Sequence, residues 1–121
     1  MTIVKLSPGK CAEVLDIPHT LEAMQKQVGG YIEAMYPFED AVAIICNEEG
    51  KLLGLDPNRA VRDPENEELL DIICGECFIC GLTEDNFCSL TEKQVDYYAN
   101  LYMNPELFFW NGSKIVIMEM V

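Results

Sequence analysis

The apolar run from Leu69 to Leu82 limits the folds open to this chain more than any other segment does. It holds three of the six cysteines and follows a strongly acidic block. A run that is apolar on both alternating sides is typical of a strand buried at the centre of a sheet. We therefore predict one continuous central strand over 69–82.

Periodicity and stop signals predict the other elements. Strands are expected over 2–6, 11–17, 31–36, 41–46 and 51–54, and in a hairpin at 107–110 and 115–118. Two helices are expected, one capped by Thr20 over 21–28 and one over 90–102, where Thr91 and Gln94 have capping-box spacing. The segment 55–66 contains two prolines and no periodicity, so it is predicted to be a loop.

These elements predict a single domain over residues 1–121. About seven strands and two helices indicate an α+β fold, with a mostly antiparallel sheet and both helices on one face. Since half of the residues are hydrophobic, a core of ordinary size needs no disulfides.

The formal net charge of −13 is the strongest global feature of the composition. Such a balance disfavours direct nucleic-acid binding, because phosphate contacts require Lys and Arg, and it favours a basic protein partner. The alternative is a merely solvated acidic surface. The candidate partner-binding residues are Asp63, Glu65, Glu67, Glu68, Asp71, Glu84 and Asp85.

No charged-apolar-small leader and no apolar run near the length of a membrane span are recognisable in the sequence. The expected location is therefore the cytoplasm of a host cell, with no membrane contact. Cysteines remain reduced there, so the six thiols are either core residues or metal ligands.

The spacing of Cys74, Cys77 and Cys80, with Cys88 eight residues later, is compatible with a structural zinc site. His19, the only histidine, is an alternative ligand. The competing interpretation is ordinary buried thiols, because a straight strand points Cys77 away from Cys74 and Cys80.

Asn58, Arg59 and Arg62 form a second candidate site, for an anionic ligand, because guanidinium groups bind phosphates with two parallel hydrogen bonds. The alternative is that the arginines fix the loop by pairing with nearby acids such as Asp63 and Glu65. No nucleophile–base pair and no glycine-rich phosphate loop can be named, so we expect no enzyme.

Five short motifs together resemble a small bacterial family of unknown function found on phages, prophages and conjugative elements of Gram-positive bacteria. They are Gly29-Gly-Tyr-Ile-Glu33, Tyr36-Pro-Phe38, Cys46-Asn-Glu-Glu-Gly-Lys51, Gly54-Leu-x-Pro-Asn-Arg-Ala60 and Phe87-Cys-Ser-Leu-Thr91. Where the family pattern has Ala-Gly-Thr-Phe at 74–77, this chain has Cys-Gly-Glu-Cys.

The resemblance implies an accessory protein of a mobile element, and small acidic proteins of that kind often disarm host defence. The leading hypothesis is therefore a non-enzymatic, anti-CRISPR-type protein that binds an RNA-guided DNA nuclease of a type II system. Its acidic surface would block nucleic-acid loading. The alternative hypothesis is a module that binds or sequesters a signalling nucleotide through Asn58, Arg59 and Arg62.

Overall fold

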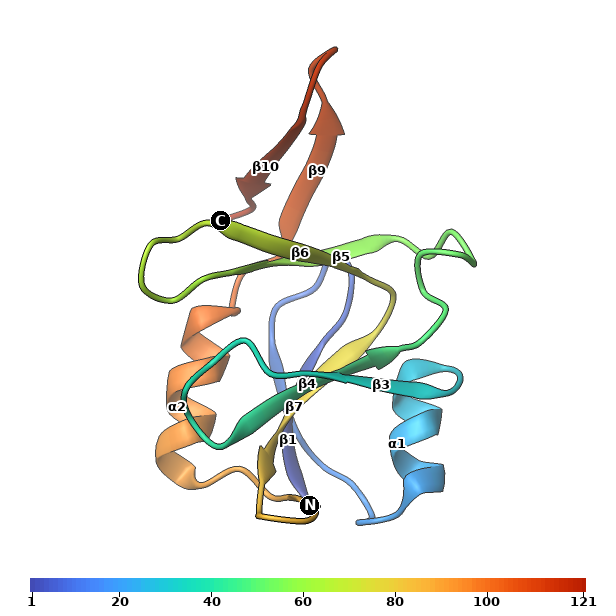
Figure 1. The fold of residues 1–121 in the computed structure, drawn as a ribbon, viewed down its shortest axis with the longest axis vertical. Coiled ribbons are helices and arrows are strands. Elements are labelled where there is room, and N and C mark those ends of the chain that lie inside the picture. The colour runs from blue at the N-terminus through green and yellow to red at the C-terminus, as the bar shows by residue number, and fades with distance from the viewer.

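A computed structural model describes residues 1–121, and its largest unit is a six-stranded sheet (Figure 1). The strands of this sheet are β1 (Thr2–Leu6), β2 (Glu13–Asp16), β3 (Ile32–Met35), β4 (Val42–Asn47), β7 (Cys77–Leu82) and β8 (Phe87–Cys88). Five of them run in the order β2-β1-β7-β4-β3, and β8 pairs with the end of β7.

Two further sheets contain two strands each. One pairs β5 (Pro57–Arg62) with β6 (Leu69–Cys74), and the other pairs β9 (Glu106–Trp110) with β10 (Ile115–Glu119). All strand pairs are antiparallel. The predicted α+β class and antiparallel pairing are confirmed, but ten strands in three sheets replace the expected single sheet of about seven.

Two helices, α1 (Leu21–Val28) and α2 (Glu92–Leu101), cover opposite faces of the main sheet, as Figure 1 shows. Alternation along the central strands explains this arrangement, because successive side chains point to opposite faces. In β4, Ile44 belongs to the core under α2 and Ile45 to the core under α1. The expectation that both helices lie on one face is therefore wrong.

The helix ends follow the local sequence signals. The hydroxyl of Thr20 accepts a hydrogen bond from the backbone of Ala23, and Gly29 ends α1 with a left-handed φ of 75°. Thr91 and Gln94 form the predicted capping box at the start of α2. Neither helix is long and apolar enough to cross a membrane.

The predicted central strand is broken at Gly75 and Glu76. The first half, β6, pairs with β5, whereas the second half, β7, lies between β1 and β4 in the main sheet. Gly75 has φ +90°, and a Cβ there would lie 2.6 Å from Leu55 Cδ1, so the bend requires glycine. One apolar run therefore supplies strands to two sheets.

Two other predictions in this region are wrong. Residues 57–62 form β5, although 55–66 was expected to be a loop. Residues 51–54 are turn rather than strand, because the chain curls back after β4 to reach β5. The hairpin near the C-terminus is confirmed, and β9 and β10 project away from the main sheet (Figure 1).

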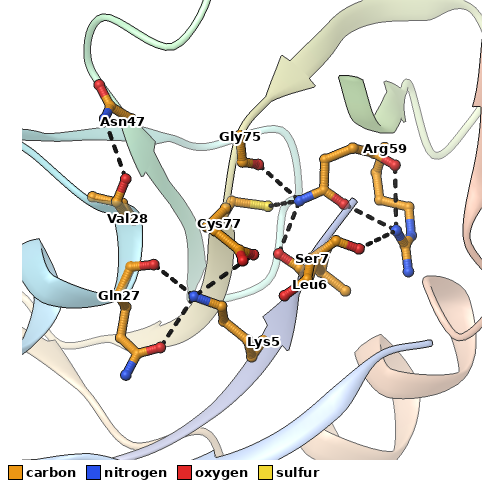
Figure 2. Close-up of polar contacts among 11 residues, drawn as sticks. Lys5, Leu6, Ser7, Gln27, Val28, Asn47, Arg59, Gly75 and Cys77 are labelled. Atoms are coloured by element: carbon orange, nitrogen blue, oxygen red, sulfur yellow. Dashed lines mark hydrogen bonds and ion pairs between the residues drawn. The ribbon is translucent and has the colours of Figure 1, made fainter. Parts of the chain in front are cut away.

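Buried cations contact the C-terminal ends of both helices. Lys5 Nζ donates hydrogen bonds of 2.6 Å and 3.1 Å to the backbone and side-chain oxygens of Gln27 in α1 (Figure 2). Arg59 donates to the backbone oxygen of Tyr102, directly after α2. Helix C-termini carry partial negative charge, so each cation stabilises its helix by about 0.3–2 kcal/mol.

Candidate functional site

The acidic loop, residues 63–68 between β5 and β6, is held in shape by its own hydrogen bonds. Asp63 Oδ1 accepts the backbone N–H of Glu65 at 2.8 Å, and Asn66 Oδ1 accepts that of Glu68 at 2.9 Å. The backbone of Asp63 also exchanges hydrogen bonds with Glu67 and Glu68. Glu65, Glu67 and Glu68 are therefore displayed in solvent on an ordered turn.

A second segment, residues 36–41 between β3 and β4, lies opposite this loop. Its conformation is fixed through Asp40, whose carboxylate accepts hydrogen bonds from the Ala41 backbone, Gln94 Nε2 and the Tyr98 hydroxyl. Burial, with a smaller contribution from the Asp40 hydrogen bond, raises the pKa of Tyr98 well above its ordinary value. The phenol therefore remains a donor at neutral pH and joins the segment to α2.

Aromatic rings fill the space behind these two segments. The ring centroids of Phe38 and Tyr98 are 5.1 Å apart, and those of Tyr97 and Tyr98 are 4.9 Å apart in an edge-to-face arrangement. Tyr98 is buried, but 58% of Tyr97 is exposed. Tyr97 therefore offers an accessible ring beside the acidic loop.

Together these parts line a cleft of about 460 Å³, which we call the acidic cleft. Its lining residues are Pro37, Phe38, Glu39, Asp40, Asp63, Pro64, Glu65, Tyr97 and Tyr98. The ion pairs of the protein involve neither Glu39 nor Glu65, so two unneutralised carboxylates flank an aromatic wall. Such a cleft is suited to a guanidinium or ammonium group.

The other predicted acids lie in two separate places. Glu84 and Asp85 line a hollow of about 440 Å³ with Tyr36, so this hollow and the acidic cleft flank the same segment, residues 36–41. Asp71 lies on β6 and pairs with Lys51, which neutralises it. Six of the seven predicted acids therefore form no ion pair, and they lie in the acidic loop or beside the 36–41 segment. Asp71 is the exception.

Sequence reasoning missed Glu39, Asp40 and Tyr97. Only tertiary packing brings them to the acidic loop, since they lie in a different connection and on a helix. The available signal was the Tyr36-Pro-Phe38 motif, which places an exposed turn with an aromatic ring directly before two acids.

The four cysteines proposed for zinc do not converge. Cys77 belongs to the core under α2 and Cys80 to the core under α1, and burial raises the pKa of both thiols to about 12. Metal ligation requires thiolates on one side of the backbone. No group of three or more His, Cys, Asp or Glu side chains is placed to hold a metal ion, and His19 is exposed. This arrangement gives the zinc site no support, and the zinc site stays a prediction.

Asn58 and Arg59 are buried structural residues in this fold. Asn58 Nδ2 donates to the backbone oxygens of Leu6 and Gly75 at 2.8 Å and 2.9 Å, and thereby joins β5 to β1 and to the bend before β7. The Arg59 guanidinium, only 1% exposed, donates to backbone oxygens of Ser7, Lys10 and Tyr102 (Figure 2 shows the contact with Ser7). Its donors are therefore already occupied.

Arg62 lies apart from this buried pair. It is exposed and donates to the backbone oxygen of Glu67 at 3.4 Å. The three residues proposed for an anionic ligand thus do not form one pocket. The competing expectation, pairing with Asp63 or Glu65, is also not what the structure shows, because no arginine ion pair is present.

Comparison with known proteins identifies a family but no activity. A family model described as "Domain of unknown function (DUF3846)" matches residues 1–103, which include both cores and the acidic cleft. No curated protein and no solved structure matches the chain. The chemistry of the acidic cleft is therefore the basis on which a function can be argued.

Proposed function

Because the chain belongs to the DUF3846 family, whose function is unknown, we propose a function from its surface chemistry: it is a non-enzymatic protein that binds a basic protein through its acidic cleft. The observation that carries the proposal is the pairing of free carboxylates with an exposed ring. Glu39 and Glu65 line the cleft from two different connections, and Tyr97 lines it from α2.

A positively charged side chain can make two kinds of favourable contact in this cleft. A guanidinium group forms charge-assisted hydrogen bonds with carboxylates, and its flat face stacks on an aromatic ring. An exposed cation–π contact alone contributes about 0.5–1 kcal/mol. Phosphate groups, in contrast, are repelled, so the cleft is selective for arginine or lysine over nucleic acid.

The proposed partner is the basic nucleic-acid-binding groove of a host defence nuclease, and specifically an RNA-guided DNA nuclease of a type II CRISPR system. Carboxylates displayed on the ordered loop would occupy the lysines and arginines that otherwise contact phosphates, which prevents target DNA from loading. The formal charge of −13 supports fast encounter with such a groove by electrostatic steering.

Binding to purified RNA-guided nucleases at about 150 mM salt tests the proposal. The double variant Glu39→Gln/Glu65→Gln removes two charges at the acidic cleft, and Glu22→Gln/Glu48→Gln removes two exposed charges elsewhere. We expect the cleft variant to bind about tenfold more weakly and the control to bind nearly as the parent does. Equal losses in both variants would show that only overall charge matters, and no binding to any nuclease would refute the partner class.

A further inference from the structure

The hairpin β9–β10 has no buried residue in either strand. It is a two-stranded sheet attached to the body mainly at its base, where Glu106 Oε1 accepts the backbone N–H of Ala60 in β5 at 2.7 Å. Isolated two-stranded hairpins are marginal in water, and three or more strands with a covered apolar face are needed for independent stability. Within residues 1–121 no further element covers the faces of the hairpin.

Large apolar side chains occupy both faces of this hairpin. Pairing of Leu107 with Met118 and of Phe109 with Val116 places these residues on one face, while Trp110 lies on the other face. The exposed fractions are 49% for Leu107, 41% for Phe109, 71% for Trp110 and 54% for Met118. An exposed apolar group of this size marks an interaction surface.

Charge is distributed in a way that favours contact through this element. Residues 105–121 contain two acids and one base, so that −12 of the formal −13 lies on the rest of the chain. Two copies of so acidic a body repel each other. The hairpin projects beyond the body (Figure 1), so two copies could meet through it while their bodies remain apart.

The positions of the charged residues in the hairpin favour a second copy of the same chain as its partner. Its one cation, Lys114, lies at the turn, whereas its two carboxylates, Glu106 and Glu119, lie at the base. A two-fold axis between antiparallel hairpins brings each turn beside the other copy's base, and therefore places opposite charges together twice. A tip-to-tip contact would instead place the two lysines together.

We propose that β9–β10 is a homodimerisation element, in which the hairpins of two copies pack face to face in antiparallel orientation through the face that carries Leu107, Phe109 and Met118. The packing joins two marginal sheets into one two-layer unit and covers apolar side chains of both copies. Lys114 of each copy lies near Glu119 of the other. The contact is separate from the acidic cleft, so each dimer carries two clefts.

Sedimentation velocity from about 1 to 500 µM tests the proposal, and we expect the mass to rise from 13.7 kDa to twice that value. A chain that stays monomeric at 500 µM, or that grows into open-ended oligomers, would overturn the proposal.

Substitutions then test the charge arrangement at two exposed side chains, of which only Glu119 has a polar contact within the chain, a 2.9 Å hydrogen bond from Asn104. Lys114→Glu is expected to raise the dissociation constant about tenfold, and Lys114→Glu with Glu119→Lys should restore it. Lys93→Glu, the same charge reversal at an exposed lysine of α2, is the matched control and should leave the dimer nearly unchanged. Failure of the charge exchange to restore pairing, or an equal effect of the control, would refute the antiparallel hairpin contact.

Discussion

Arg59 and Trp110 both depart from the burial that is usual for their residue types, because the arginine is buried and the tryptophan is exposed. The two residues differ in the contacts that they make. The guanidinium group is 1% exposed and the indole is 71% exposed. The guanidinium group of Arg59 donates to oxygen atoms of Ser7, Lys10, Asn58 and Tyr102. Trp110 has no contacts of comparable extent. The difference places the buried polar contacts in the body and leaves the hairpin surface open to the association proposed above.

Among the changes compared below, Arg59→Ala should lower the free energy of unfolding the most. Removing the guanidinium leaves the backbone oxygens of Lys10 and Tyr102 without these donors in a buried space, and each unsatisfied group costs about 1–3 kcal/mol. We expect the free energy of unfolding in urea to fall by about 3 kcal/mol or more. Arg62→Ala, at an exposed arginine three positions away, should change it by less than about 0.5 kcal/mol. Similar effects of both would mean that the buried network is not structural.

Alkaline pH should have the next largest effect on the stability of the body. Burial raises the pKa of Cys46 to about 11 and of Cys77 and Cys80 to about 12, from an ordinary value of 9.0. The folded chain therefore keeps protons that the unfolded chain loses, so stability is complete below pH 9 and falls as pH rises toward 11–12. Lys5 acts in the opposite direction, because burial lowers its pKa, but it is one group against these three thiols, and burial raises the pKa of Cys74, Tyr98 and Tyr102 as well.

Urea titrations between pH 7 and pH 10.5 measure this decline. Cys80→Ala removes one of the three titrating thiols and should make the loss of stability with pH less steep. A stability that is constant or rising over this range would contradict the assignment of protonated thiols to both cores.

Tyr98→Phe should have a smaller effect, confined to the wall of the acidic cleft. The variant keeps the buried ring but loses the 3.1 Å hydrogen bond from the hydroxyl to Asp40. A single lost hydrogen bond of this kind costs about 1 kcal/mol, and Asp40 still has donors in Ala41 and Gln94. Chemical denaturation gives the loss, and Tyr97→Phe, at an exposed ring, is the control. A loss as large as that of Arg59→Ala would place the main stabilising network at the cleft instead.

Phe109→Ser should have the smallest effect on folding. The side chain lies on the projecting hairpin and is 41% exposed, so at about 1 µM protein the free energy of unfolding should change by less than about 0.5 kcal/mol. At high concentration the parent should gain stability from self-association while the variant does not. Thermal unfolding at both concentrations measures the difference, and a large loss at 1 µM would show that the hairpin supports the body.

Local signals predicted the elements whose ends are set by a few adjacent residues. Thr20 and Gly29 bound α1, Thr91 and Gln94 start α2, and Asn111-Gly112 lies in the turn between β9 and β10. These interactions are formed between close neighbours in the chain, so the sequence contains both partners together.

Non-local interactions explain the failures. β5 was read as loop because Pro57 and Arg59 interrupt its apolar pattern, but Arg59 is buried by partners more than 40 residues away. The bend at Gly75 was missed because the apolar run continues through it. At the candidate site, composition identified the acidic loop, whereas Glu39 and Tyr97 reach it only through the packing of α2.

The acidic loop keeps its shape through Asp63 and Asn66, whose side chains accept hydrogen bonds from the backbone. The side chains of Glu65, Glu67 and Glu68 make no such contact. Glu65 and Glu68 can thus mutate with little penalty in folding, whereas Glu67 has a left-handed φ of 60° that few side chains adopt readily. Under selection by changing partners, this segment could diversify rapidly on a constant frame, and differences among related chains should concentrate there.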